Sequence, residues 1–385
     1  MGTARRLALG RLVSLSGGSA AYIALVAAIY GETGSALWVS GAIFSSVVAS
    51  VAAAPFAGWI GDHFDRRRVL IGADMAAAAV SLAMAATATH PSALVVLLGL
   101  SSVAHAPFEP ASAAALPNVV PEADVPRANA LVAATSSAGY LLGPLLGGAV
   151  LSVGASPATV FVVDAGTFVF SALLVAAIDH PFGRGSTEEN PGALAGLRLI
   201  AREPALRVPV LSGMVSLFGV GIVDVASYPL SLNLHGGTTG YGAMTALLGG
   251  GGLLGSALAG RALRAESTRV LVAAFATGAA GLALAGAAPV LAIGLAGMAL
   301  AGAGRGLGDV AALTLIQARA ADEVRSRVFA AQDGAAHAAF SVSAFAGGLL
   351  VQLAGARGAF ATAAAFGVGA ALLAGCALAA PRADG

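Results

Sequence analysis

The sequence is a succession of apolar runs, each about 20 residues long, separated by short polar turns. A helical run of this length crosses the hydrocarbon core of a bilayer, because each residue adds about 1.5 Å along the helix axis. Closed barrels can also cross a bilayer, but their strands alternate in polarity over roughly 10 residues. The runs here are longer and rich in Ala, Leu and Gly. The chain is therefore predicted to be an all-α integral membrane protein.

The charge content excludes an ordinary soluble protein. Charged residues make up 10% of the 385 residues and hydrophobic residues make up 58%. A soluble domain carries about 25% charged residues, because its surface must be hydrated. The net charge of +1 says little about partners, and no basic patch lies outside the turns, so no nucleic-acid partner is expected. The single cysteine, Cys376, rules out an intramolecular disulfide.

The turns divide the apolar runs into twelve predicted spanning helices, six on each side of a polar segment. The expected helix ranges are 9–30, 36–60, 69–89, 92–116, 128–152, 157–178, 207–233, 241–262, 269–287, 289–317, 328–353 and 357–379. The polar segment, 179–206, is expected to be a cytoplasmic linker with a short surface helix near 193–203.

The placement of arginine predicts the orientation, because short loops rich in basic residues stay in the cytoplasm. All 20 basic residues are Arg. With a cytoplasmic N-terminus, Arg357 falls in an outside turn and Arg305 within a helix, and the other 18 of the 20 fall on the cytoplasmic side. Both termini are therefore expected in the cytoplasm, and the chain is expected in the cell membrane.

The two sets of six helices show signs of a repeat. At an offset of 199 residues, Val125 matches Val324 and Gly148 matches Gly347, at equivalent positions of the two sets. Parallel repeats of this kind hold a solute site between them, near the middle of the bilayer. The expected organisation is an N-terminal half at 1–178, the linker at 179–206 and a C-terminal half at 207–385.

Residues 58–70 form the most specific motif, after the second predicted helix. They read Gly-Trp-Ile-Gly-Asp-His-Phe-Asp-Arg-Arg-Arg-Val-Leu. A glycine, an acid four residues later and a following basic cluster resemble the signature loop of the major facilitator superfamily. The resemblance implies a twelve-helix fold of two pseudo-symmetric six-helix halves, which moves a solute by alternating access.

The resemblance also implies that this loop is a conformational gate. Asp65 stands where the family usually has Gly, which is a departure from the pattern. Asp74 is expected to brace the loop, and Asp333 is expected to contact its arginines. A plain cytoplasmic loop without a gating role is the alternative. The residues expected in the gate are Gly58, Asp62, Arg66, Arg67, Arg68, Asp74 and Asp333.

A second motif lies in the fifth predicted helix and resembles the antiporter motif of the superfamily's drug exporters. Its glycines, three or four residues apart, permit close approach of a neighbouring helix, and its proline bends the helix. A packing seam that has no influence on transport direction is the alternative. The residues of this helix packing motif are Gly139, Gly143, Pro144, Gly147 and Gly148.

Further segments, in the expected order, are similar to the branch that contains macrolide-efflux and enterobactin-exporter-type proteins. They are Thr33–Leu37, Leu116–Pro121, Arg127–Leu131 and Arg325–Phe329. The chain departs from this branch at Gly18, where Asp is common, and at Ala77 and Ser112, where Arg is expected. The fourth-helix Arg motif tied to proton coupling is therefore missing, which leaves the coupling mechanism open.

Ionisable residues within the predicted helices are candidates for proton coupling or substrate binding. A charge at the middle of the bilayer costs about 2.5–3.5 kcal/mol, so such residues are paired, protonated or directed into a cavity. Glu109 lies between two prolines that loosen the helix, although it can also be hydrated near the inner interface. Asp224 is the second candidate, and Asp164 is ambiguous, with a packing or capping role favoured. Arg305 and Asp309 lie four residues apart and are expected to form a structural ion pair more readily than a relay.

The remaining candidates are less specific. His105 and His337 can titrate near neutral pH, but a lone helical histidine is more often hydrogen-bonded within the packing. Several aromatic residues are expected either to line an apolar cavity or to pack between helices. They are Tyr22, Phe108, Tyr140, Phe218, Tyr228 and Phe340.

These observations predict a secondary transporter that exports a small amphipathic organic molecule, such as a drug, macrolide or siderophore, in exchange for protons. A facilitator or importer of a sugar, amino acid or other metabolite is the transport alternative. A non-transporting membrane sensor or assembly partner is the alternative of another class. No phosphate-binding loop or Cys/His cluster is present, so neither enzyme activity nor a cofactor or metal is expected. The expected partners are a small-molecule substrate, protons and the lipid bilayer, and the chain is expected to be a monomer.

Overall fold

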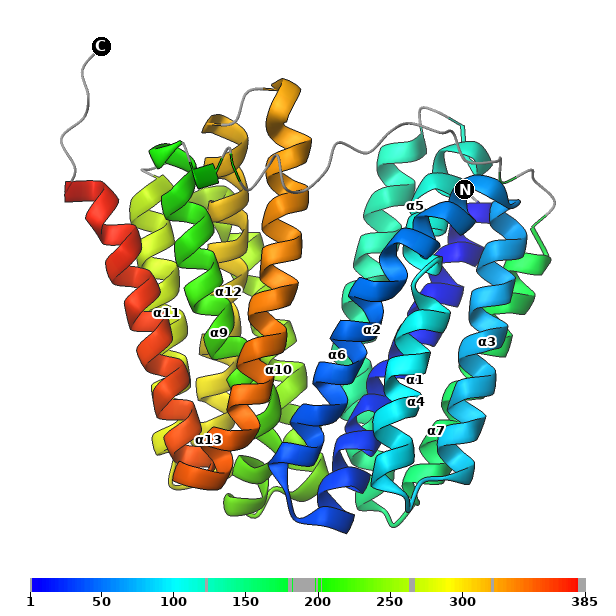
Figure 1. The fold of residues 1–385 in the computed structure, drawn as a ribbon, viewed down its shortest axis with the longest axis horizontal. Helices are drawn as coiled ribbons and strands as arrows, with labels where there is room; N and C mark the ends of the chain where they lie inside the picture. Colours follow the sequence, from blue (N-terminus) through cyan, green and yellow to red (C-terminus); the bar gives the residue numbers. More distant parts are fainter. Residues whose placement is uncertain are drawn as a thin grey trace. The chain divides into compact units, whose positions relative to one another are not determined.

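The structure is a computed structural model that describes residues 2–121, 124–178, 203–262, 267–319 and 322–379, together with 182, 198, 200 and 201. Within these residues every regular element is a helix (Figure 1). The helices are α1 (Gly2–Thr33), α2 (Ala36–His63), α3 (Arg66–Ala86), α4 (Pro91–His105), α5 (Phe108–Val119), α6 (Val125–Ser152), α7 (Pro157–Ala176), α9 (Pro204–Asn233), α10 (Gly237–Ala262), α11 (Ser267–Ala287), α12 (Leu291–Arg319) and α13 (Asp322–Ala379).

The predicted all-helical membrane fold is confirmed. Eleven segments of the described chain are long and apolar enough to cross a membrane, and the longest runs from Gly334 to Cys376. That segment of α13 is interrupted at Gly355, whose φ of 70° and ψ of 174° are not helical. Glycine adopts such a conformation without the steric cost of a Cβ. α13 therefore contains two successive spans, which correspond to the predicted ranges 328–353 and 357–379.

One predicted helix is divided in the structure. The range 92–116 forms α4 and α5, with a turn at Ala106 and Pro107 between them. Pro107 has no backbone N–H to donate, and the Ala106 N–H bonds to the Val103 carbonyl in a three-residue turn, at 3.3 Å. The break places Glu109 in the first turn of α5, where the helix dipole stabilises a negative charge.

The chain forms two compact units. Unit 1 comprises Met1–Glu188 with Gly237–Ala246, and unit 2 comprises Glu189–Gly236 with Leu247–Gly385. Most of the predicted linker at 179–206, including most of its expected surface helix, lies outside the described residues. Phe182 is described, and it is buried in the core of unit 1. The Asn118 side-chain amide donates a hydrogen bond of 3.0 Å to the Phe182 carbonyl.

The helices of each unit pack through matching pairs. In unit 1, α1 packs against α6 and α7, and α3 packs against α7. In unit 2, α9 packs against α13, and α11 packs against α12 and α13. Since α13 holds two spans, the pair of α9 and α13 corresponds to the pairs that α1 makes with α6 and α7. This pairing fits the repeat predicted from the sequence offset.

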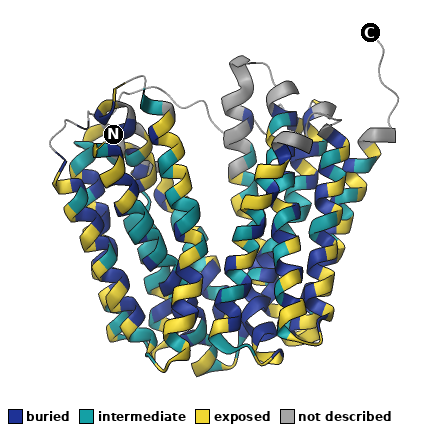
Figure 2. Cartoon of the chain, turned by 180° about the vertical axis from the view of Figure 1, so that it is seen from behind, coloured by how far each residue is buried: buried dark blue, intermediate teal, exposed yellow. Residues whose placement is uncertain are grey.

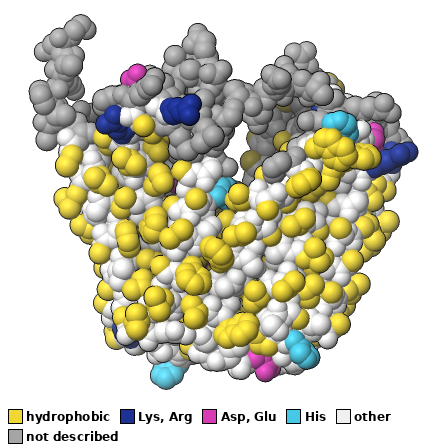
Figure 3. Space-filling view, in the orientation of Figure 1, with side chains coloured by type: hydrophobic (Ala, Val, Ile, Leu, Met, Phe, Trp, Pro, Cys, Tyr) yellow, Lys and Arg dark blue, Asp and Glu magenta, His cyan; other side chains and the backbone are white. Residues whose placement is uncertain are grey.

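In each unit, buried and exposed side chains lie on different faces of the helices. Small and aliphatic buried residues line the faces where helices meet, whereas exposed positions lie on their other faces (Figure 2). Large exposed hydrophobic residues such as Val153, Leu173 and Leu353 would be unfavourable in water. Apolar side chains cover the flanks, and arginines gather at one end of each unit (Figure 3). Such flanks suit contact with lipid acyl chains.

The packing glycines of α6 bring its backbone against α1. A Cβ placed on Gly143 would lie 2.5 Å from the Ser16 carbonyl oxygen, and one on Gly147 would lie 2.7 Å from the Ala20 carbonyl oxygen. A Cβ on Gly139 would lie 2.8 Å from the Leu15 side chain. The carbonyl contacts are with backbone, so neither position can accept a methyl group unless a helix moves.

We predict that Gly143→Ala destabilises the protein by about 1–3 kcal/mol, because the added methyl group overpacks the contact between α6 and α1. Gly166→Ala on α7 is the matched control, since nothing lies within 4 Å of a Cβ there. Thermal unfolding in detergent, followed by tryptophan fluorescence, measures both variants. Equal midpoints for the two variants would contradict the packing role of Gly143.

Candidate functional site

An ion pair in unit 1 joins α1 to α5. The Arg11 guanidinium forms an ion pair with the Glu109 carboxylate, with 2.5 Å between Nη2 and Oε1. Arg11 Nε also donates a hydrogen bond of 2.5 Å to the Ser136 hydroxyl on α6. The Arg11 side chain is 14% exposed, whereas the Glu109 side chain is 55% exposed. The pair therefore has a mostly buried cation and an accessible acid.

Aromatic and imidazole side chains surround this pair. The His105 ring stacks on Phe108, with centroids 4.7 Å apart, and makes a tilted contact with Phe168 of α7 at 5.7 Å. His105 Nε2 is buried and has no hydrogen-bond partner among the described residues. Tyr140 on α6 is exposed, and the charges of Arg11 and Glu109 act on it. The pair and its neighbours combine an accessible carboxylate with partly apolar surroundings.

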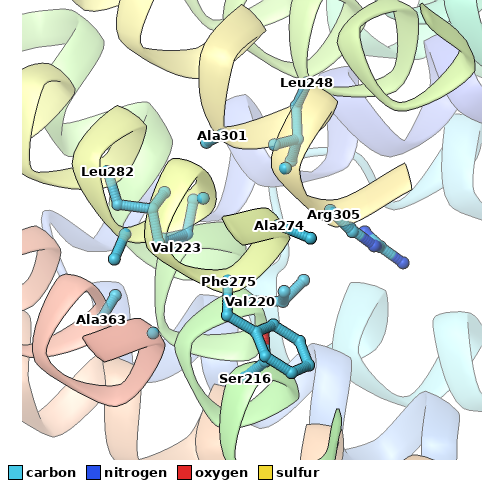
Figure 4. A pocket seen from close by; sticks show the side chains of 14 residues that line it. Ser216, Val220, Val223, Leu248, Ala274, Phe275, Leu282, Ala301, Arg305 and Ala363 are labelled. Atoms are coloured by element: carbon cyan, nitrogen blue, oxygen red, sulfur yellow. The ribbon is translucent and has the colours of Figure 1, made fainter. Parts of the chain in front are cut away.

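Unit 2 contains two adjoining cavities that share Ser216, Val220, Phe275 and Arg305. The smaller cavity measures about 40 Å³ and is mostly apolar (Figure 4). In Figure 4 the Arg305 guanidinium points away from the apolar end formed by Leu282 and Ala363. The larger cavity measures about 420 Å³. This volume lies within the range of pockets for small organic ligands.

The larger cavity has a few polar groups in an apolar wall. Its polar lining includes Arg305 and Asp309 of α12 and Gln332 of α13. Arg305 Nε and Asp309 Oδ2 are 3.8 Å apart, and both side chains are accessible. The Gln332 Oε1 atom is buried without a hydrogen-bond partner among the described residues. Val210, Met214, Leu217, Val220, Phe275 and Leu313 supply the apolar lining.

The other predicted ionisable residues lie elsewhere. Asp224 lies in α9 and is half-buried. Asp164 is 4% exposed and accepts a hydrogen bond of 2.7 Å from the Ser81 hydroxyl. Neither residue lines the two cavities of unit 2. Asp164 therefore holds α7 to α3, which is the packing role considered for it from the sequence.

The arginines of the loop at residues 58–70, called the basic loop below, make contacts that the sequence did not predict. Arg66 Nη1 donates to the Phe182 carbonyl at 3.5 Å, and Arg67 donates to the Ala176 carbonyl at the end of α7. The Asp65 carboxylate caps α3 by accepting from the Arg68 backbone N–H at 3.2 Å. The side chain at position 65 thus has a structural role where the family usually has Gly.

The expected brace from Asp74 to these arginines is not formed. Asp74 is fully buried in α3, and neither carboxylate oxygen has a hydrogen-bond partner among the described residues. The Asp74 side chain instead points into the contact between α3 and α7, since Ser171 of α7 is the side chain that acts on it. The side chains of Asp62 and Asp333 and the surroundings of Gly58 lie outside what the structure describes, so their expected gate contacts stay predictions.

The predicted aromatic residues are mostly packing residues. Phe108 and Tyr228 are buried, and Phe218 stacks on Phe366 with centroids 5.6 Å apart. Tyr22 and Phe340 are half-buried. None of the six lines either cavity of unit 2, where Phe275 is the aromatic residue in the wall.

Four residues of these sites escaped the sequence reasoning: Arg11, Ser136, Phe275 and Gln332. Arg11 was grouped with the cytoplasmic arginines, although it lies within the first apolar run. Its countercharge, Glu109, is 98 residues away along the chain, so no local spacing indicates the pair. Phe275 and Gln332 carry no signal that distinguishes them from other helical residues.

Together, the spanning helices, the repeated packing of two units, and the accessible charged groups within apolar walls define a membrane transport protein. The sequence profile of the Major Facilitator Superfamily matches residues 7–264. The chain belongs to this superfamily, and it is a transport protein and not an enzyme.

Similar proteins agree with this assignment. The Uncharacterized MFS-type transporter YfiS of Bacillus subtilis (strain 168) is 27% identical over 323 residues, covering 80% of this chain and 76% of YfiS. The Multidrug efflux pump Tap of Mycolicibacterium fortuitum is 26% identical over 245 residues, or 58% of each chain. The crystal structure of nucleoside transporter NupG matches with a TM-score of 0.78 at 14% identity, covering 98% of this chain and 99% of NupG. That last likeness shows the fold alone.

We predict that Glu109→Ala destabilises the protein by about 1–3 kcal/mol, because the mostly buried Arg11 charge loses its partner. The double variant Arg11→Ala, Glu109→Ala is expected to cost less than the sum of the two single variants. Thermal unfolding of the four proteins provides this double-mutant cycle. Additive effects would show that the two side chains do not interact.

Proposed function

We propose that the protein is a proton-coupled exporter of a small amphipathic organic molecule. The observation that carries this proposal is the Arg11–Glu109 ion pair, whose acid is 55% exposed within a bundle of apolar helices. We infer that this accessible carboxylate takes up and releases the coupled proton beside the mostly buried Arg11 guanidinium. Protonation of Glu109 would remove the attraction to Arg11 and free α5 and α1 to change their contact.

The larger cavity of unit 2 supports an organic substrate. Its wall offers apolar area from Met214, Leu217 and Phe275 and charged groups from Arg305 and Asp309. Apolar walls with a few convergent polar groups are typical of small-molecule sites. A sugar would require more hydrogen-bonding groups than this cavity provides, so an amphipathic molecule fits it better.

The proposed direction is outward. It is supported by the similarity to the Multidrug efflux pump Tap and by the glycine motif of α6, which resembles the antiporter motif of drug exporters. The proposed location is the cell membrane, with both termini in the cytoplasm, as the distribution of arginines indicates. We propose that the chain acts as a monomer.

The central test follows the proton gradient in inside-out vesicles as macrolides, dyes, siderophores and lipophilic cations are added. Active compounds are expected to dissipate the gradient with the wild type but not with Glu109→Gln, because the amide cannot exchange a proton. Glu32→Gln is the matched control, since Glu32 is an exposed carboxylate at the end of α1. Dissipation that persists in Glu109→Gln would exclude Glu109 as the coupling acid. If no compound of the panel dissipates the gradient with the wild type, the proposed substrate class is contradicted.

The proposal that the larger cavity binds the substrate is tested by a substitution that fills the cavity. Gly213 lines the larger cavity, and nothing lies within 4 Å of a Cβ built there. Gly213→Leu is expected to raise the KM for transport at least tenfold without loss of folded protein, because its side chain occupies substrate space. Gly166→Leu is the control, because a Cβ at Gly166 also meets open space but Gly166 lines neither cavity. An unchanged KM in Gly213→Leu would place the substrate elsewhere.

The orientation is tested by cysteine labelling in a Cys376→Ala background. His90 lies in the turn between α3 and α4, and Arg5 lies near the start of α1, and both are exposed. A membrane-impermeant thiol reagent is expected to label His90→Cys in intact cells and Arg5→Cys only after permeabilisation. The reverse pattern would invert the proposed topology.

A further inference from the structure

The contact between α3 and α7 contains two aspartate–serine pairs in opposite order. Ser81 of α3 faces Asp164 of α7, and Asp74 of α3 faces Ser171 of α7. Seven residues separate the two positions on each helix, which is about two helical turns. Because α3 and α7 run antiparallel, the two pairs lie one above the other along the same contact.

The pair of Ser81 and Asp164 is satisfied by hydrogen bonds. Asp164 Oδ2 accepts from the Ser81 hydroxyl at 2.7 Å, and the Thr167 hydroxyl lies 3.5 Å from Asp164 Oδ1. α1 covers this pair with Gly17, where a Cβ would lie 2.8 Å from Asp164 Oδ1. The carboxyl of Asp164 is thus enclosed by three helices and accepts a short hydrogen bond from Ser81, with the Thr167 hydroxyl beside its other oxygen.

The pair of Asp74 and Ser171 lacks such bonds. Asp74 is 0% exposed and Ser171 is 1% exposed. Neither Asp74 oxygen, nor the Ser171 hydroxyl, has a hydrogen-bond partner among the described residues. Ser171 is the side chain that faces Asp74 across this contact, but the two do not meet the geometry of a hydrogen bond. α1 encloses this pair too, since a Cβ on Gly10 would lie 3.2 Å from the Ser171 hydroxyl oxygen.

An ionised Asp74 would be unfavourable at this place. A buried carboxylate requires a cation or several hydrogen-bond donors, and otherwise takes up a proton. The nearest arginines along α3 bond elsewhere, Arg66 to the Phe182 carbonyl and Arg67 to the Ala176 carbonyl. A protonated Asp74 needs no countercharge, and its O–H group can donate to the Ser171 oxygen.

We propose that Asp74 is a proton-binding site, separate from Glu109, that controls the contact between α3 and α7. One proton adds to the carboxylate to form a neutral carboxylic acid, and the same proton leaves when the pH rises. With the proton bound, α3 and α7 pack closely. Without it, a charge lies between the two helices and must be hydrated, which separates them.

A separation of α3 from α7 at Asp74 would also move the basic loop. α3 begins at Arg66, so Asp74 lies about two turns from the loop arginines. Arg67 ties the start of α3 to the end of α7 through the Ala176 carbonyl. A shift of α3 away from α7 would break this contact and release the arginine. The proton on Asp74 thereby sets whether Arg67 of this loop is held against the end of α7.

Other titratable groups on helices that pack against α3 and α7 must be distinguished from Asp74. They include Asp164 on α7, His105 on α4, Glu109 on α5, His63 at the end of α2, and Arg6 and Arg11 on α1, of which Arg6 bonds to the Ala177 carbonyl beyond the end of α7. Arginine stays charged over the accessible pH range. Single amide variants of the acids and Asn variants of the histidines separate the remaining groups.

The test is infrared difference spectroscopy of the full-length protein in lipid nanodiscs, on a step from acid to alkaline pH. We expect the wild type to lose a protonated-carboxyl C=O band that is absent from Asp74→Asn and retained in Asp164→Asn and Glu109→Gln. Ser171→Ala is expected to shift the frequency of this band, because the acid loses its hydrogen-bond acceptor. The band in Ser171→Ala also assigns the signal if Asp74→Asn fails to fold.

Three results would overturn the proposal: no such band in the wild type, an unchanged band in Asp74→Asn, or a band in Ser171→Ala at the wild-type frequency. A band that persists in Asp74→Asn but disappears in Asp164→Asn would show that the proton binds at Asp164 instead. Because Glu109→Gln is measured in the same way, failure of this proposal is distinguishable from failure of Glu109 as the coupling acid.

A second measurement uses the stability of unit 1. Both tryptophans of the chain, Trp38 and Trp59, lie in α2 of unit 1, so their fluorescence follows its unfolding. A group that binds its proton more tightly when folded makes stability fall as the pH rises. The wild-type melting temperature is therefore expected to fall from acid to neutral pH, and Asp74→Asn is expected to remove most of that fall. An equal pH dependence in the two proteins would contradict the proposal.

Discussion

A carboxylic acid inside a spanning helix must be paired, hydrogen-bonded or protonated, and the acids of unit 1 meet this requirement in different ways. Glu109 is paired with Arg11, and Asp164 accepts hydrogen bonds from Ser81 and Thr167. Asp74 has neither kind of partner among the described residues. The differences follow from position, because a helix break exposes Glu109, whereas the contact of α1, α3 and α7 encloses the two aspartates. The surroundings of each acid therefore determine how its charge is compensated.

These surroundings depend on how closely the helices approach, which small residues permit. Gly143 and Gly147 bring α6 against α1, and this contact places Ser136 within 2.5 Å of Arg11 Nε. Gly17 leaves room on α1 for the Asp164 carboxyl. A larger side chain at a glycine of α6 or at Gly17 of α1 would separate the helices that carry the polar groups. In a bilayer, where lipid is as apolar as leucine, such packing and interhelical hydrogen bonds provide much of the attraction between helices. The glycines thus hold together the helices that carry these polar groups.

The sequence was sufficient to predict the helices, because their signal is local. Apolar runs indicated each span, and glycine spacing indicated the seam on α6, where Gly143 and Gly147 meet the α1 backbone. The break before Glu109 was partly foreseen, since the prolines at 107 and 110 were expected to loosen the helix. The partners of the charged groups were harder to predict. Arg11 and Glu109 meet only after the chain folds, and Asp74 was expected to reach arginines on its own helix but faces Ser171 on α7. A short window of sequence does not indicate which neighbouring helix will cover a given face.

The two units share a packing scheme but not an arrangement of charge. In unit 1 the ion pair joins separate helices, so breaking it alters the contact between α1 and α5. In unit 2 the pair of Arg305 and Asp309 lies within α12, four residues apart, so it does not join two helices. An interhelical pair is suited to coupling protonation to movement, whereas a pair within one helix is suited to presenting opposite charges to a ligand. This difference supports the proposal that unit 1 couples transport to protons and that the cavity of unit 2 binds the substrate.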